Sequence, residues 1–130
     1  MKQSIFVLMI ACFAFFGCSS PDESTRLFIP GTYVKEIKDE FTEGMDTLTI
    51  KVLDYKSYNY TITRNTSYSQ TIDGKTLPAK SDMHKWTAVF RPTTMQLIEQ
   101  SQGRVFTFSP ERNVLSMGSS VYRKISNEWM

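Results

Sequence analysis

Residues 46–54 read Asp-Thr-Leu-Thr-Ile-Lys-Val-Leu-Asp, and this stretch decides the fold class. Leu48, Ile50 and Val52 alternate with threonine and lysine, so apolar and polar side chains repeat with a period of two. Side chains of a β-strand point alternately to the two faces of a sheet, so this period predicts a strand with one buried face. Similar alternation recurs at 58–64, 84–91 and 104–109.

Turn signals separate these runs. Asp73-Gly74 and Gln102-Gly103 suit two-residue hairpin turns, where glycine adopts positive φ without a Cβ clash. Pro92 and Pro110 stand where the fixed φ of proline fits a type I turn. Gly44 is interpreted as the break between the first and second runs. Strands are therefore expected near 31–38, 46–54, 57–64, 67–72, 84–91, 95–101, 104–109, 113–117 and 120–125.

This pattern predicts an all-β fold, a small antiparallel meander of eight or nine short strands. A meander of this size protects its edges best by closing into a barrel. No window predicts a helix, because residues 93–102, which are compatible with one, lie between turns that favour a strand.

The first 17 residues predict an export signal. Lys2 precedes the unbroken apolar run 5–16. A transmembrane helix needs about 20 apolar residues, so this shorter run fits a secretory signal.

The end of that run, Phe15-Phe16-Gly17-Cys18, resembles the lipobox of bacterial lipoproteins, in which a small residue precedes a cysteine. Gly17 and Cys18 match the motif, whereas Phe15 and Phe16 replace its usual leucine and small residue. The resemblance implies that Cys18 is lipidated and anchors the protein to a membrane. The alternatives are an ordinary signal peptide with a chance cysteine and a short anchor that is not cleaved.

These features divide the chain into four parts. Residues 1–17 are the signal peptide, 18–29 the lipidated cysteine with a polar flexible tether, 30–126 the β-barrel domain and 127–130 a C-terminal tail. Ser19, directly after the cysteine, resembles lipoproteins sorted to the outer membrane of Gram-negative bacteria. We therefore expect a lipid-anchored protein of the outer membrane, on its periplasmic face or at the cell surface.

The barrel domain carries a second resemblance. Gly31-Thr32-Tyr33 opens the run of hairpins and residues 121–125, Val-Tyr-Arg-Lys-Ile, close it. This layout is similar to the small lipocalin-like lipoproteins of Gram-negative envelopes and implies a lipocalin-like barrel. The Gly-x-Trp signature of true lipocalins is missing, so the resemblance does not extend to ligand binding.

Few residues could carry catalysis. His84 is the one histidine, and the sequence contains no Gly-rich phosphate loop, no paired catalytic carboxylates and no nucleophile elbow. Cys12 leaves with the signal, so the exported domain has no free thiol for a cysteine-based site. We expect no enzyme, cofactor or metal. The formal net charge of +2, with no long basic run, predicts no nucleic-acid partner.

Aromatic residues are frequent in the expected strands. Filling the core of a small barrel is the favoured interpretation, and stacking on a ligand at its mouth is the alternative. Tyr55, Tyr58 and Tyr68, near strand ends, are the candidates for contact with a ligand or partner. The polar segment 65–85 is expected to project as a long hairpin or to form a solvated loop.

The expected function is a non-catalytic outer-membrane lipoprotein that acts as an interaction module for another protein of the cell envelope. The alternative is a β-barrel that binds a small apolar ligand or a glycan. An envelope enzyme, which would need His84, is the third hypothesis.

Overall fold

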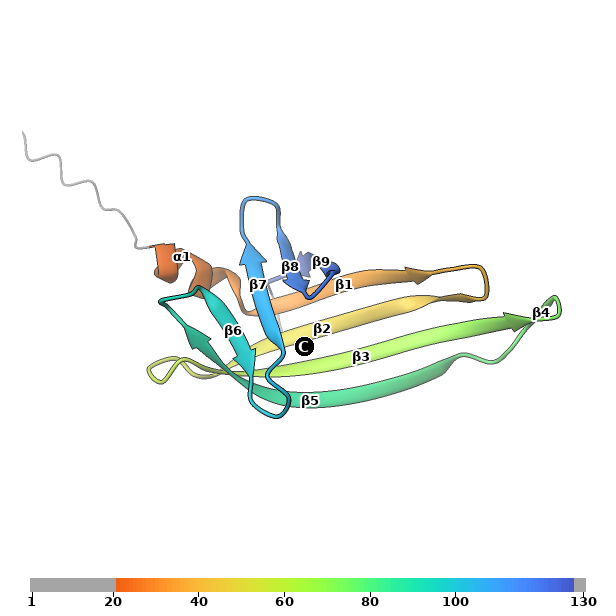
Figure 1. The fold of residues 1–130 in the computed structure, drawn as a ribbon, viewed down its shortest axis with the longest axis horizontal. Coiled ribbons are helices and arrows are strands. Elements are labelled where there is room, and N and C mark those ends of the chain that lie inside the picture. Colours follow the sequence, from red (N-terminus) through yellow and green to blue (C-terminus); the bar gives the residue numbers. More distant parts are fainter. Residues whose placement is uncertain (1–20, 128–130) are drawn as a thin grey trace, which may run out of the picture.

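The computed structural model describes residues 21–127, in which antiparallel strands dominate (Figure 1). The prediction of an all-β fold is confirmed. The elements are α1 (Pro21–Phe28), β1 (Gly31–Lys38), β2 (Thr42–Asp54), β3 (Asn59–Ile72), β4 (Lys75–Thr76), β5 (Lys80–Arg91), β6 (Gln96–Glu99), β7 (Val105–Ser109), β8 (Val114–Met117) and β9 (Ser120–Ser126).

Eight of the strands form a closed antiparallel barrel. Their order is β2-β1-β9-β8-β7-β6-β5-β3, and the pairing of β2 with β3 closes the ring. Strand β4 pairs with β3 alone and stands outside the ring. Because neighbours in the chain are neighbours in the barrel, this is an up-and-down meander, the topology of lipocalin-type barrels. The barrel closure expected from the sequence is confirmed.

The barrel interior is filled by side chains. Every second residue of the barrel strands points inward, as the alternation in the sequence predicts. The aromatic side chains Tyr33, Tyr60, Phe90, Phe106 and Tyr122 are almost without accessible surface. Core filling, the favoured role for the aromatics, holds for these five. The other members of the core cluster are Ile29, Leu48, Ile50, Ile62, Ala88, Leu97 and Leu115.

Four strands continue beyond the barrel as a curved sheet, which we call the arm and define as residues 35–47, 64–76 and 80–85 (Figure 1). The expected long hairpin over 65–85 is therefore present. Two details of the prediction were wrong. Gly44 lies inside β2, and the turn before it is formed at 39–41, where Asp39 Oδ1 accepts bonds from the Phe41 and Thr42 amides. The strands expected at 57–64 and 67–72 are one strand, because β2 and β5 pair with β3 on both sides.

Helix α1 occupies most of the segment 18–29, which was expected to be a flexible tether. The expectation that the chain has no helix was therefore wrong as well. Arg26 lies in the last turn of the helix, where a cation complements the helix dipole. A helix of eight residues is too short to be stable alone, so its contacts with the barrel hold it. Thr25, Arg26 and Ile29 are buried, and the Tyr33 hydroxyl donates to the carbonyl oxygens of Phe28 and Ile29, both at 2.9 Å.

Candidate functional site

The inner face of the arm continues the inner face of the barrel but is lined by polar side chains. Strand register places Asp46 of β2 opposite Lys35 of β1 and Thr66 of β3, and Thr66 opposite Asp82 of β5. One step toward the barrel, Arg64 lies opposite His84. The arm therefore presents charges of both signs on a surface that no further strand covers.

A buried charged cluster forms the base of the arm. The Asp46 carboxylate accepts hydrogen bonds from Arg64 Nη2 and the Tyr122 hydroxyl, each at 2.7 Å, and from Thr66 Oγ1 at 3.2 Å. Burial by itself would raise the pKa of Asp46, but the bonds from Arg64 and Tyr122 and the Arg64 charge hold it below its usual value. Burial, with the neighbouring Asp46 carboxylate, raises the pKa of Tyr122. This cluster fixes β2, β3 and β9 to one another where the barrel ends.

Tyr68 lies farther out on the inner face of the arm. It is half-buried and opposite Gly44 of β2 and Lys80 of β5. A Cβ at Gly44 would lie 2.1 Å from the Ser67 carbonyl oxygen and 2.6 Å from the Tyr68 Cα. Glycine is therefore required there by the close approach of two backbones, and Tyr68 covers the strand that lacks a side chain.

Strand β5 has a free edge. Its partner β6 pairs only with Ala88 to Arg91, and the Gln100 amide bonds to the Thr87 carbonyl oxygen at 3.0 Å. Backbone groups of a strand point alternately to its two sides, so Ser81, Met83 and Lys85 direct theirs away from β3. Within residues 21–127 these groups have no recorded backbone partner. The edge of the arm can therefore accept another strand.

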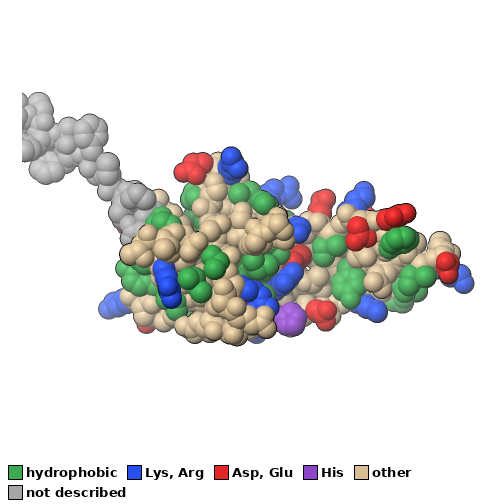
Figure 2. Space-filling model, in the orientation of Figure 1, with side chains coloured by type: hydrophobic (Ala, Val, Ile, Leu, Met, Phe, Trp, Pro, Cys, Tyr) green, Lys and Arg blue, Asp and Glu red, His purple; other side chains and the backbone are tan. Residues whose placement is uncertain are grey.

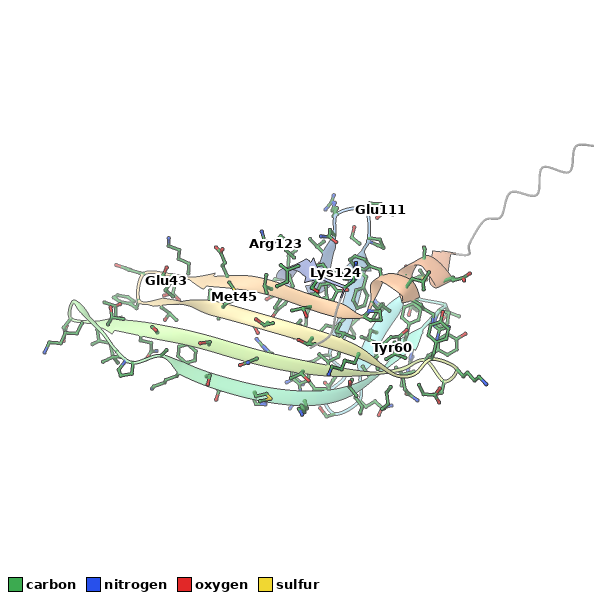
Figure 3. All side chains as sticks on the ribbon, turned by 180° about the vertical axis from the view of Figure 1, so that it is seen from behind. Glu43, Met45, Tyr60, Glu111, Arg123 and Lys124 are labelled. Carbon is green, nitrogen blue, oxygen red and sulfur yellow. The ribbon has the colours of Figure 1, made fainter. Side chains whose placement is uncertain are left out.

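Apolar side chains are exposed along the arm as well. Phe41, Met45, Ile72 and Met83 each expose two fifths or more of their surface. In Figure 2 apolar side chains appear among charged ones over this part of the molecule. Figure 3 places Met45 and Glu43 on the arm, whereas Tyr60 lies at the opposite end, near α1.

At that opposite end α1 covers the barrel, and Tyr55 and Tyr58 take part in the closure. The Arg26 guanidinium carbon lies 3.6 Å from the ring centre of Tyr55 and 4.0 Å from that of Tyr58, and Arg26 donates to the Tyr55 carbonyl oxygen. Lys124, buried beside the helix, donates to the Phe28 carbonyl oxygen, and burial lowers its pKa. These contacts hold the helix on the barrel.

Two buried polar atoms at this end have no partner among the described residues, Arg26 Nε and the Tyr60 hydroxyl. Burial raises the pKa of Tyr60, and the nearby Arg26 charge opposes part of that rise.

The three tyrosines predicted to contact a ligand or partner do not form one site. Tyr55 and Tyr58 flank Arg26 at the helix end, and Tyr68 lies at the other end of β3 on the arm. Cys18, the predicted lipidation site, falls outside the described residues. The sequence reasoning missed Asp46, Arg64 and Tyr122, because an isolated acidic, basic or aromatic residue in a strand gives no sign of its distant partners.

His84, the histidine that the enzyme hypothesis needs, lies on the inner face of β5. His84 is exposed, and its ring stacks beside Trp86 with 6.3 Å between ring centres. No group of three potential metal ligands occurs in this part of the chain. No helix within the same range is long and apolar enough to cross a bilayer. Comparison with protein-family models, with curated proteins and with solved structures gives no match for this chain.

Proposed function

We propose that this protein is a lipid-anchored, non-catalytic interaction module of the outer membrane, and that the arm docks on another protein of the cell envelope. The observation that carries the proposal is the arm itself. It is a four-stranded sheet that extends past a complete barrel, with an open strand edge on β5 and exposed apolar side chains. Natural sheets usually cover such edges, so an exposed one suits a binding surface.

The placement of the ends supports the same proposal. Helix α1 begins at Pro21, with only two residues between it and the proposed lipid-bearing Cys18. The helix lies at one end of the molecule and the tip of the arm, near β4, at the other (Figure 1). A lipid on Cys18 would hold the closed end of the barrel close to the membrane and direct the arm away from it.

The ligand-binding alternative has one observation in its favour, a strip of His84, Trp86 and Arg104 beside the inner face. The Arg104 guanidinium carbon lies 4.4 Å from the Trp86 ring centre, and His84 stacks on the same indole. Buried side chains occupy the barrel interior, so a glycan or small apolar molecule would bind outside it, and this strip is a candidate for that site. Docking by the arm accounts for more of the exposed surface, and we prefer it.

In-cell photo-crosslinking tests the docking proposal. The photoreactive p-benzoylphenylalanine replaces Phe41, which is 61% exposed at the β1–β2 turn of the arm. The matched control replaces Val121, which is 54% exposed on the barrel. We expect one envelope protein to be captured from Phe41 and not from Val121. Equal capture at both positions, or none at Phe41, would contradict docking by the arm.

The anchor is tested separately with Cys18→Ala. We expect this variant to leave the membrane fraction and to lose the Phe41 crosslink. A Cys18→Ala protein that still sediments with membranes would contradict the lipid anchor. That result would leave the proposal of docking by the arm unaffected.

A further inference from the structure

We infer that the free edge of β5 pairs with the same edge of a second copy of this chain, which joins two arms into one continuous antiparallel sheet. The inference goes beyond the proposed function, because docking on an envelope protein does not require a dimer. It rests on the length of the free edge, on the register that this length dictates and on the charges that the register brings together.

Both ends of the free edge are defined. On the barrel side the edge stops at Thr87, whose carbonyl oxygen already accepts the Gln100 amide. On the tip side it stops at Pro78, which has no amide hydrogen to donate. Between them Ser81, Met83 and Lys85 direct their amide and carbonyl groups outward.

Three outward residues allow one antiparallel register that uses all of them. In this register Met83 lies opposite Met83 of the second copy, and Ser81 lies opposite Lys85. Each of the three pairs can exchange two hydrogen bonds, because all three are hydrogen-bonded positions of the ladder. If the register is shifted by one step in either direction, one of these three residues no longer lies opposite another of the three, and its amide and carbonyl groups lose their partner.

The same register pairs the polar side chains favourably. On the inner face it places the Asp82 carboxylate opposite the His84 imidazole of the second copy, twice by symmetry, so that a ring N–H can donate to a carboxylate oxygen. The register shifted toward the tip would put Asp82 against Asp82, and directly opposed like charges destabilise a sheet. The register shifted toward the barrel would place each Asp82 opposite Trp86 and leave the carboxylate without this donor. Met83, 62% exposed in the single chain, is buried against its copy.

Cysteine crosslinking tests the register on the full-length protein extracted from membranes in mild detergent. Opposed Cα atoms in a hydrogen-bonded pair lie about 5.5 Å apart, within the range a disulfide spans. We expect Met83→Cys to form a covalent dimer on oxidation. Met45→Cys, also exposed but on the interior strand β2, and the unsubstituted chain are the controls and should stay uncrosslinked. Equal crosslinking of Met45→Cys would overturn the inference.

Charge exchange tests the pairing without a covalent bond. Asp82→Lys removes the carboxylate opposite each His84 and should weaken the dimer about tenfold in sedimentation analysis. The double variant Asp82→Lys/His84→Asp places a lysine opposite a carboxylate in this register alone and should regain most of the affinity. A double variant as weak as Asp82→Lys would reject the register.

Met83→Pro provides a third readout. An edge strand tolerates proline where its amide faces solvent, so the fold and the unfolding midpoint should be kept. The dimer should be lost, because the central pair can no longer exchange both bonds.

A chain that is monomeric before any substitution, at concentrations up to about 100 µM, would overturn the inference. The Phe41 crosslink reports on the opposite side of the arm, so either proposal can fail alone.

Discussion

Strands β2 and β3 change character along their length. In the barrel, every second side chain of β2 and β3 is buried between neighbouring strands, as at Leu48, Ile50, Tyr60 and Ile62. In the arm, β3 has no buried residue past Thr63, and on β2 the buried residue is the charged Asp46. The strands of the arm are held by backbone pairing and by the cluster around Asp46. The contrast teaches that closure, rather than strand length, determines where this protein has a core.

Core truncation in the barrel should have the largest effect. Phe106→Ala removes a fully buried ring and leaves a cavity, and should lower the free energy of unfolding by about 3–5 kcal/mol. Phe41→Ala, an exposed ring on the arm, is the control and should change it by no more than about 0.5 kcal/mol. Urea unfolding with an unchanged m value measures both. If both variants lowered the free energy of unfolding by a similar amount, the barrel and the arm would not differ in how much they contribute to the core.

A change confined to the arm should be smaller and local. Gly44→Val places side-chain atoms against the backbone of Ser67 and Tyr68, and should cost about 1–3 kcal/mol. Hydrogen exchange should show faster amide exchange in the arm parts of β2 and β3, with the barrel amides still protected. Ser67→Ala, next to the same contact, serves as the control. Uniform loss of protection would mean that arm and barrel unfold together.

Acid should weaken the barrel through Glu99, which lies buried under the turn between β6 and β7. Burial alone would raise its pKa, but bonds from Ser101, Arg104 and the Gln102 amide lower it to about 2 from 4.5. Because the folded-state pKa is depressed, this stabilisation is complete above about pH 4.5 and is lost as pH falls toward 2.

Glu99→Gln should therefore lower the free energy of unfolding by about 1–2 kcal/mol at pH 7 and flatten its decline between pH 4.5 and 2. Urea midpoints measured across this range test the prediction. Glu111→Gln, on an exposed turn, should follow the parent protein. A Glu99→Gln curve parallel to that of the parent would contradict the assigned role.

The smallest effect concerns the two tyrosine positions that the structure separates. Tyr55→Leu removes one of the two rings that flank Arg26 and should cost about 0.5–1 kcal/mol, with faster exchange of the α1 amides. Tyr55→Leu should leave the Phe41 crosslink unchanged. Tyr68→Leu on the arm should leave the exchange of the α1 amides unchanged and weaken the Phe41 crosslink. If both variants gave the same response, the tyrosines would belong to a single site after all.

Much of the fold could be predicted locally. The period of two at 46–54 and 84–91 placed strands within a few residues of their observed bounds, and the hairpin turn at Asp73-Gly74 has the expected positive φ, 50° and 76°. The positions missed were those whose conformation depends on distant partners. Residues 42–45 and 65–66 show no clear alternation and are parts of strands because neighbouring strands pair with them, and α1 is a helix because the barrel end binds it.

The candidate site was less predictable than the fold. Tyr68 was identified, but its partners on the arm were not, since the register that aligns it with Gly44 and Lys80 spans strands far apart in the sequence. Tyr55 and Tyr58 were identified as candidate contact residues because they lie near strand ends. Only the tertiary structure shows that both rings flank Arg26 of the helix.

The sequence by itself determined the all-β class, the antiparallel meander and most of its turns, because alternation and turn chemistry act between residues close in the chain. Only the tertiary structure decided that four strands continue past the closed barrel as an arm, that Asp46, Arg64 and Tyr122 meet, and that residues 21–28 form a helix. These features depend on register and on contacts between distant segments, and no local pattern of side chains records either.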